Sequence, residues 1–258
     1  MANIIHPTAL LEGNVTLGNG NHIGPYVVMR GDITIGDNNI IGSAAGIKNK
    51  VTIGNNNRIY SQASIGPVGE MGLKGDRLVP DGKVIIGNHT TIRESVCIHS
   101  PVYTLETRIG DHVYLMNKSY VAHDGIVGDS CVLSAGVLLG GRVTLEEGVT
   151  IGMGATVHQR TFIGAYSMIG MQTPVTKDVL PYATVAGSPA RIIGFNRKGA
   201  ERTITDVALL DELESFFQNE ILHGQQSRNP MIIAIMEFLS DHPEALVQLK
   251  KSKHPFND

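Results

Sequence analysis

The sequence predicts an all-β solenoid, a parallel β-helix built from hexapeptide repeats, followed by a small C-terminal α-helical domain. Three observations lead to this fold class. An aliphatic residue recurs at every sixth position, glycine, asparagine and aspartate gather between these positions, and the period is lost after about Ala186. A period of six fits neither an α-helix nor an ordinary strand, whereas a fixed repeat is the signature of a solenoid. We expect the β-helix at residues 1–190 and the helical domain at residues 191–258.

The aliphatic positions define the coils of the β-helix. The six-residue period holds without a miss over residues 5–65, resumes over 86–98 and continues over 109–175. Three hexads are expected to form one triangular coil, whose aliphatic side chains point inward and build a continuous buried column. Adjacent strands lie about 4.8 Å apart. Residues three hexads apart in an uninterrupted stretch should therefore lie directly above one another.

The turns between the short strands explain the composition. The chain has 30 glycines, and asparagine and aspartate cluster in runs such as Asp37-Asn38-Asn39 and Asn55-Asn56-Asn57. These residue types tolerate the positive φ angles that tight turns require. The composition thus agrees with the repeat.

Two loops interrupt the repeat, at residues 66–85 and 99–108. The first loop is charged and long enough to reach a neighbouring subunit. Excursions from a regular scaffold often carry function, although a plain surface loop is the alternative. The charged residues of the first loop are Glu70, Lys74, Asp76, Arg77 and Asp81.

The C-terminal segment predicts helices. Apolar residues at three- and four-residue spacings favour an amphipathic helix over residues 203–222. Two shorter helices are expected at residues 231–239 and 243–250, the second beginning with Pro243 in its first turn. Most of their apolar residues are expected to pack rather than to bind a ligand.

Composition excludes several functional classes. The chain has 258 residues, 42% of them hydrophobic, and no apolar run near 18 residues, so we expect a soluble protein without a transmembrane segment. The repeat begins within five residues of Met1, so we expect no signal peptide. Cys97 and Cys131 are the only cysteines, as suits a reducing cytoplasm. A net charge of −3 without a basic cluster gives no support for nucleic-acid binding.

One hexad carries candidate chemistry. His123 lies in the hexad 121–126, and a neutral imidazole with a pKa near 6.5 suits proton abstraction at pH 7. Asp124 could hold this imidazole in one tautomer. By the repeat spacing Gly141 should lie above His123, where its backbone N–H could reach a reacting carbonyl oxygen. The alternative is a solvated turn histidine.

Four motifs resemble the UDP-N-acetylglucosamine O-acyltransferases of lipid A biosynthesis. They are IYSQASIG at 59–66, IRESVCIH at 92–99, VAHD at 121–124 and VHQ at 157–159, and the similarity runs from about His6 to Arg202. The resemblance implies a left-handed β-helix that forms a homotrimer with active sites between adjacent solenoids. It also implies direct transfer of a 3-hydroxyacyl group from acyl carrier protein to a sugar hydroxyl of UDP-GlcNAc. No further cofactor or metal is implied, and the enzyme is expected in the cytoplasm.

The resemblance assigns roles to individual residues. It implies that His123 is the general base, Asp124 its orienting partner and Gly141 the oxyanion donor. Met171 matches the position that limits acyl length, where a methionine implies a short-to-medium acyl group. The positions that contact substrate or line the cleft are Lys74, His99, His158, Gln159, Asn196 and Arg202, of which Arg202 suits a diphosphate.

The chain departs from the family around the acceptor. Tyr120 and Arg142 each replace a histidine, and we expect both to contact substrate. Gly72 stands where the family has an acid that binds the sugar, in a loop one residue longer. Arg160 replaces an aromatic residue and Lys198 an acidic one. Such changes should alter which acceptor is bound.

Three functions remain open from the sequence. The first is transfer of an acyl group from acyl carrier protein to a hydroxyl or amine of a nucleotide sugar, most simply one like UDP-GlcNAc. The second is acetyl-CoA-dependent acetylation of an amino sugar, because the fold alone does not fix the function. The third is a non-catalytic trimeric homologue. Retention of His123, Asp124 and Gly141 favours catalysis, and Met171 favours the carrier protein as donor.

Overall fold

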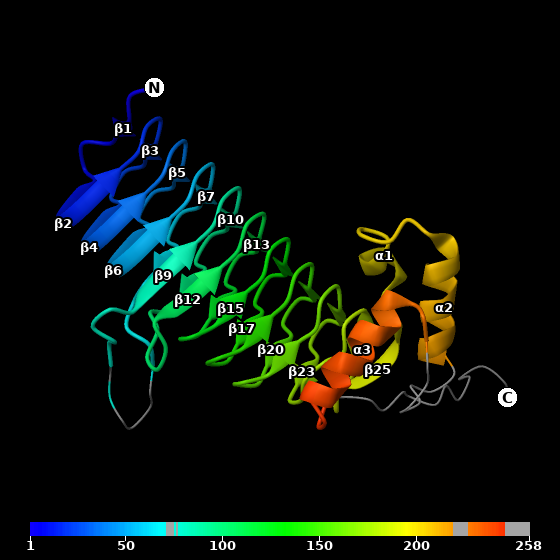
Figure 1. Ribbon diagram of the computed structural model, residues 1–258. Coiled ribbons are helices and arrows are strands. Elements are labelled where there is room, and N and C mark those ends of the chain that lie inside the picture. The colour runs from blue at the N-terminus through cyan, green and yellow to red at the C-terminus, as the bar shows by residue number, and fades with distance from the viewer. Residues whose placement is uncertain (71–74, 76, 219–226, 246–258) are drawn as a thin grey trace, which may run out of the picture.

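The chain folds into a left-handed parallel β-helix with α-helices packed at its C-terminal end, as expected (Figure 1). The computed structural model describes residues 1–70, 75, 77–218 and 227–245. Short strands stack into three faces of a triangular prism, and consecutive coils pair in parallel. No helix within these residues is long and apolar enough to cross a membrane.

The first face of the prism is a sheet of eleven strands. Ten of them pair in parallel from coil to coil, and the last pair, β24 and β25, is antiparallel. In spatial order the strands are β1 (Ile4–Ile5), β3 (His22–Ile23), β5 (Ile40–Ile41), β7 (Arg58–Ile59), β10 (Thr91–Ile92), β13 (Tyr114–Leu115), β16 (Val132–Leu133), β19 (Thr150–Ile151), β22 (Met168–Ile169), β24 (Ala183–Ala186) and β25 (Arg191–Phe195).

The second and third faces share their first three strands, which are eight residues long and continue from one face onto the next. These strands are β2 (Leu10–Leu17), β4 (Val28–Ile35) and β6 (Gly46–Ile53). The second face continues with β8 (Ser64–Ile65), β11 (Cys97–Ile98), β14 (Tyr120–Val121), β17 (Leu138–Leu139), β20 (Thr156–Val157) and β23 (Pro174–Val175). The third face continues with β9 (Lys83–Ile86), β12 (Glu106–Ile109), β15 (Ile126–Val127), β18 (Thr144–Leu145) and β21 (Phe162–Ile163).

Turns after the strands form three corners that run the length of the prism. We call the corner after the first face the first corner; it contains residues 116–118, 134–136, 152–154 and 170–172. The second corner, after the second face, contains 122–124, 140–142 and 158–160. The third corner contains 110–112, 128–130, 146–148 and 164–166. Many of these turns hold a non-glycine residue with positive φ.

The core is the aliphatic column that the period predicts. Inward residues such as Ile65, Val121, Leu139 and Ile169 have no exposed surface. Every side chain in this column loses its contact with water, and apolar burial contributes about 25 cal/mol per Å² to folding. The repeat therefore supplies both the shape of the prism and most of the apolar surface that it buries.

Both interruptions of the repeat are shorter than the sequence suggests. Strand β9 begins at Lys83 and strand β12 at Glu106, inside the segments expected as loops 66–85 and 99–108. The two strands pair with each other over four residues, from Lys83 with Glu106 to Ile86 with Ile109. This ladder extends the third face toward the second corner and sets where each loop ends.

The C-terminal region differs from the expected helical domain at its start. Residues 191–195 form β25 rather than a helix, because they pair with β24 and close the first sheet. Three helices follow: α1 (Arg197–Ala200), α2 (Val207–Gln218) and α3 (Pro230–Asp241). The helix expected from residue 203 begins only at Val207, since the Asp206 carboxylate accepts from the N–H of Ala208 and starts the helix there.

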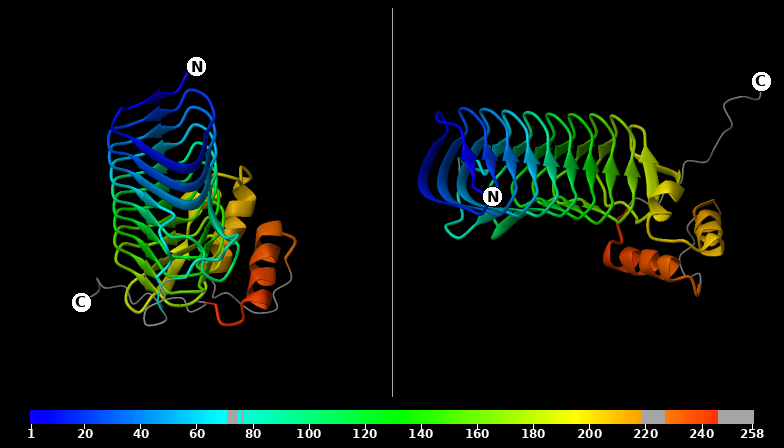
Figure 2. Two further views of the ribbon diagram at one scale, coloured as in Figure 1. Left: turned by 90° about the vertical axis from the view of Figure 1, so that its left-hand side faces the viewer. Right: turned by 90° about the horizontal axis from the view of Figure 1, so that it is seen from above.

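Helix α3 agrees with the segment 231–239 and begins at Pro230, with Asn229 as its N-cap. It lies beside the last coils, and α2 lies beyond their end (Figure 2). Phe238 of α3 packs 5.7 Å from Phe162 of β21, measured between ring centroids. The helix expected at 243–250 shows only turn and bend residues at 243–245, and the rest of that segment lies outside the described residues.

Candidate active site

Three successive turns of the second corner build the site. His123 and Asp124 follow β14, Gly141 and Arg142 follow β17, and Gln159 follows β20. Their register is fixed by the parallel pairing of β14, β17 and β20. The N–H of Arg142 donates to the carbonyl oxygen of His123 over 3.0 Å. The pairing of the preceding strands therefore holds the three turns one coil apart.

Gly141 lies against the ring of His123, as the spacing of the repeat predicts. A Cβ placed on Gly141 would lie 2.5 Å from Cε1 and 2.7 Å from Nε2 of His123. Real Cβ atoms do not approach other atoms this closely, so only glycine leaves room for the imidazole. Among the described residues, no acceptor is found for the N–H of Gly141. This N–H can therefore serve a ligand.

His123 and Asp124 form a hydrogen-bonded pair. Nδ1 of His123 lies 2.7 Å from Oδ2 of Asp124, whose side chain has no exposed surface. A carboxylate only accepts, so Nδ1 carries the proton and the neutral ring keeps its lone pair on Nε2. The side chain of His123 is 14% exposed, which leaves it accessible. The basic nitrogen is thus the one that faces Gly141.

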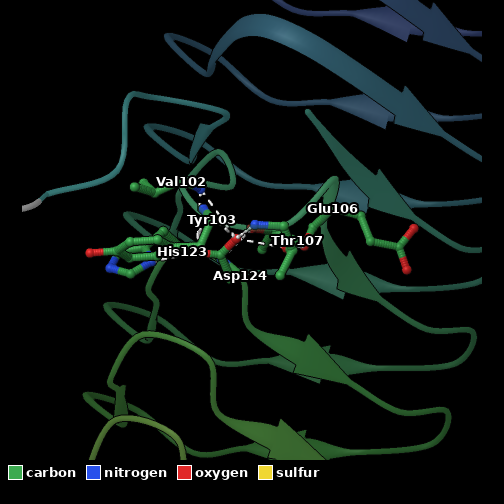
Figure 3. Close-up of polar contacts among 7 residues, drawn as sticks. Val102, Tyr103, Glu106, Thr107, His123 and Asp124 are labelled. Atoms are coloured by element: carbon green, nitrogen blue, oxygen red, sulfur yellow. Dashed lines mark hydrogen bonds and ion pairs between the residues drawn. The ribbon is translucent and has the colours of Figure 1, made fainter. Parts of the chain in front are cut away.

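The loop 99–108 wraps the Asp124 carboxylate in donors (Figure 3). The N–H groups of Val102, Tyr103 and Thr104 donate to its Oδ1 over 3.2, 3.0 and 2.7 Å. The hydroxyl of Thr104 donates to the same oxygen over 2.7 Å. Burial alone would raise the pKa of Asp124, but the hydrogen bonds from Thr104, His123 and Tyr103 outweigh it, and the pKa is lowered. Asp124 therefore remains a carboxylate at neutral pH.

A cavity of about 220 Å³ opens in front of His123. Its wall is made by both loops and by all three turns. The lining residues are Glu70, Tyr103, His123, Gly141, Arg142, Gln159 and Arg160. Two larger hollows, of about 660 and 390 Å³, lie on α3 and beside the Ser188–Pro189 peptide, and neither contains a predicted site residue. The chemistry of His123 therefore identifies the smaller cavity as the candidate site.

His99, which is buried, and Tyr120, which is half-buried, form a pair on the second face. Their rings meet edge to face with 5.0 Å between centroids. Burial lowers the pKa of His99, and Nδ1 of His99 has no partner among the described residues. Burial, and then the charges of Glu70 and Cys97, raise the pKa of Tyr120 to about 12. At neutral pH both groups are uncharged and can take part in hydrogen bonds.

The cavity has two lining residues that the sequence analysis did not assign. Tyr103 lies beside both His123 and Arg142: its ring centroid is 5.7 Å from that of His123 and 4.0 Å from Cζ of Arg142. Glu70 was noted only as a loop charge. The sole signal for either residue was its position in an interruption of the repeat. Within the described residues, no three His, Cys, Asp or Glu side chains converge as they would around a metal ion.

Known proteins that resemble this chain in sequence and others that resemble it in structure carry the same name. No sequence profile of a known family matches the chain. Over 122 residues it is 38% identical to the acyl-(acyl-carrier-protein)–UDP-N-acetylglucosamine O-acyltransferase of Ectopseudomonas mendocina, a stretch that is 46% of this chain and 47% of the relative. The UDP-N-acetylglucosamine O-acyltransferase structure from Moraxella catarrhalis is 30% identical, with a TM-score of 0.78 over 93% of this chain and 92% of that chain. The chain belongs to the UDP-N-acetylglucosamine O-acyltransferase family.

Membership in the UDP-N-acetylglucosamine O-acyltransferase family confirms the resemblance that the four motifs indicated. The match to the curated relatives spans about half of their length, 47% for the Ectopseudomonas protein. The fold extends over the whole chain. The structure of the Francisella novicida UDP-N-acetylglucosamine acyltransferase, 23% identical, superimposes with a TM-score of 0.84 over 99% of this chain and 100% of that one.

Some residues at UDP-N-acetylglucosamine O-acyltransferase positions lie away from His123 in this chain. Asn196 caps α1, accepting from the N–H of Gly199 and donating to the carbonyl oxygen of Tyr166. Nη1 of Arg202 reaches the carbonyl oxygen of Gly148 over 3.4 Å. Both residues thus lie at the third corner. Met171 lies at the first corner and is 72% exposed.

Of the remaining residues predicted to contact substrate, some lie near the cavity and others do not. His158 shares the turn of Gln159, where its Nδ1 lies 3.1 Å from the carbonyl oxygen of Gln159, but it does not line the cavity. Lys74 and Gly72 fall outside the described residues. The structure thus brings Gly141, Arg142 and Gln159 together with His123. It leaves Asn196, Arg202 and Met171 on the other two corners.

Proposed function

We propose that the protein transfers a short-to-medium (3-hydroxy)acyl group from acyl carrier protein to a hydroxyl or amine of a nucleotide sugar resembling UDP-GlcNAc. The names of the relatives supply the donor and the acceptor class. The single observation that carries the chemistry is the contact between the ring of His123 and the backbone of Gly141. This contact supports a general base at His123 and an oxyanion donor at Gly141 that act on one reacting carbonyl. Both substrate classes are cytoplasmic, so we propose this location for the protein.

The proposed reaction is a direct attack on the thioester. Nε2 of His123 takes the proton from the acceptor hydroxyl or amine as the acceptor's oxygen or nitrogen bonds to the thioester carbonyl carbon. Asp124 accepts from Nδ1–H and stabilises the imidazolium that results. The N–H of Gly141 donates to the oxyanion of the tetrahedral intermediate. Collapse breaks the carbon–sulfur bond, and the leaving thiolate takes the proton back from His123.

We further propose that the protein acts as a homotrimer with sites shared between chains. The residues expected to contact substrate lie on three different corners of one prism: His123 on the second, Met171 on the first and Arg202 on the third. Side chains on different corners of a packed prism cannot surround one ligand. A cyclic assembly would bring the second corner of one chain to another corner of its neighbour. The charged loop at 66–85 is the natural element to span the two chains.

Acyl transfer can be tested with purified protein. Acyl carrier protein loaded with 3-hydroxyacyl groups of graded length is mixed with UDP-GlcNAc or with a UDP sugar bearing a 3-amino group. Free carrier thiol and the acylated sugar are then followed by mass spectrometry. We expect turnover with short-to-medium donors and a loss of about 100-fold or more in His123→Ala. The matched control is His22→Ala, an exposed histidine on β3 far from the cavity.

Two outcomes would contradict the proposed function. If only acetyl-CoA were used, with an amino sugar as acceptor, the protein would be an acetyltransferase. If His123→Ala kept full activity, the cavity at the second corner would not be the active site. Equal folding of the variants is checked by circular dichroism and by size-exclusion chromatography.

A further inference from the structure

Two arginines lie in equivalent positions of successive coils beside the catalytic pair. Arg142 lies one coil from Asp124, and Arg160 one coil further along the second corner. The N–H of Arg160 donates to the carbonyl oxygen of Gly141 over 2.9 Å, which fixes the distance between the two turns. Both side chains line the 220 Å³ cavity that contains His123. Two guanidinium groups therefore share one small space with the proposed base.

Neither guanidinium is neutralised by the described part of the chain. Arg30, Arg93, Arg108 and Arg197 each lie within 4.0 Å of an acidic side chain, but no described acid lies so close to Arg142 or Arg160. Glu70 lines the same cavity without reaching either arginine. Its negative charge instead acts to raise the pKa of His99 and the pKa of Tyr120. The cavity wall is thus cationic on the side of the two turns.

Arg142 also has an unused donor. Its Nε is buried and has no hydrogen-bond partner among the described residues. A buried donor without an acceptor is unfavourable, and a ligand that supplies one is correspondingly favoured. The face of the guanidinium is occupied by the Tyr103 ring, with Cζ 4.0 Å from the centroid. This contact orients Arg142 and leaves the N–H groups in its plane for another ligand.

The donors in the plane of a guanidinium match the two oxygens of a carboxylate. We propose that Arg142 and Arg160 bind a carboxylate carried by the sugar ring of the acceptor. This inference rests on the proposed function and names its acceptor class. Arg142 directly follows Gly141, so its side chain begins where the reacting carbonyl is held. The group that it binds belongs to the reacting sugar, whereas Arg202, expected to bind the diphosphate, lies at another corner.

Chemistry also indicates which sugar carbon bears the acid. In a hexopyranose, carbon 6 lies outside the ring and can be oxidised to a carboxylate without loss of a ring hydroxyl. The acceptor class is therefore a nucleoside diphosphate sugar with a 6-carboxylate, acylated on a neighbouring hydroxyl or amine. The uncharged counterpart, with a 6-hydroxymethyl group, would leave both guanidinium groups without a counter-charge.

Binding tests this inference without the acyl donor. The full chain is titrated calorimetrically with UDP-GlcNAc and with the same nucleotide sugar oxidised to the 6-carboxylate. We expect the carboxylate ligand to bind about ten-fold or more tightly, the scale of one charge-assisted hydrogen-bonded pair. Arg142→Gln and Arg160→Gln should each bring the ratio of the two Kd values toward one. Arg142→Lys, which keeps the charge but loses the planar donors, should retain part of the ratio.

The control is Arg58→Gln, which removes the same charge from an exposed position on β7 of the first face. It should leave the ratio of Kd values as in the unsubstituted protein. Equal affinity of the unsubstituted protein for both ligands, or no binding of either, would overturn the inference. So would an equal weakening of both ligands in Arg142→Gln, because the guanidinium would then serve the shared diphosphate. The proposed function is judged separately, by acyl transfer to UDP-GlcNAc.

Discussion

Thr104 donates twice to one oxygen of Asp124: its backbone N–H and its hydroxyl each lie 2.7 Å from Oδ1. Asp124 in turn donates its N–H to the hydroxyl of Thr107 over 2.8 Å. The loop that interrupts the repeat after His99 and the start of β12 are thereby tied to the His123–Asp124 pair by bonds in both directions. The orientation of His123 depends on this loop as much as on the β-helix.

We expect Thr104→Val to weaken the site without removing any group that touches substrate. Valine keeps the shape and the N–H but loses the hydroxyl, and a hydrogen bond to a charged group contributes about 1.5–3 kcal/mol. Asp124 has a lowered pKa, so its contribution to stability is present above the unfolded value near 3.8 and is lost as the pH falls through the folded value. The difference in the free energy of unfolding between Thr104→Val and the unsubstituted protein should be seen at pH 7 and shrink below pH 3.8.

Denaturant unfolding at several pH values measures this difference, and kcat/KM should fall about ten-fold at pH 7. The matched control is Thr156→Val, on the exposed side of β20. A difference in stability that stayed constant down to pH 2 would show that the hydroxyl acts through packing alone.

Gly141→Ala should disable the enzyme by crowding the base. The new Cβ would meet Cε1 of His123 at 2.5 Å, so the imidazole must move away from the oxyanion site. We expect kcat to fall by about 100-fold or more, the scale of a general base moved out of place. The control is Gly46→Ala, where a Cβ meets nothing within 4 Å. Steady-state kinetics of both variants test this prediction. Near-normal turnover in Gly141→Ala would show that the contact between Gly141 and His123 is not needed for the reaction.

Tyr120→Phe should impair acceptor binding by the same factor at every pH between 6 and 9. Burial raises the pKa of Tyr120 to about 12, so the hydroxyl stays protonated and remains a donor throughout this range. Loss of one neutral hydrogen bond corresponds to a rise of several-fold in KM for the acceptor. KM measured at pH 6 and pH 9 tests the prediction. An effect that vanished at pH 9 would mean that the tyrosine titrates within the range.

Mixed trimers test whether sites are shared between chains. We expect His123→Ala and Arg202→Ala to be nearly inactive as separate preparations. If each site takes His123 from one chain and Arg202 from its neighbour, every trimer that contains both variants has one restored site, so about a third of the sites in the mixed trimers should be active. Co-expression with two affinity tags, followed by an activity assay of doubly purified protein, makes the measurement. Activity no higher than in the single variants would indicate that each chain carries its own site.

The repeat made much of the fold predictable. Its spacing gave the coils, the inward aliphatic column and the contact of Gly141 with His123, because parallel pairing transmits one register from coil to coil. Residues that are 18 positions apart in the sequence, such as His123 and Gly141, are neighbours in adjacent coils.

The parts that the spacing missed lie outside the period. Donors to Asp124 come from residues 102–104, a segment whose path depends on tertiary contacts rather than on any repeat. The strand at residues 191–195 was taken for part of a helical domain because its partner, β24, has no hexad pattern to signal it. The position of Arg202 also lies outside the period, because the repeat has ended before it, whereas the unbroken count from 109 to 175 already places Met171 on another corner than His123.

Because coils stack at a fixed interval, the proposed active site depends on the number of residues between its members. Inserting a single residue between Asp124 and Gly141 would turn every later position by one step, so that the glycine no longer faces the imidazole. Inserting one whole coil between Gln159 and Met171 would keep every position in phase. It would move Met171 about 4.8 Å farther from the base. Gene duplication of a coil is thus a route by which such a protein could change the length of the acyl chain that it accepts while leaving its chemistry intact.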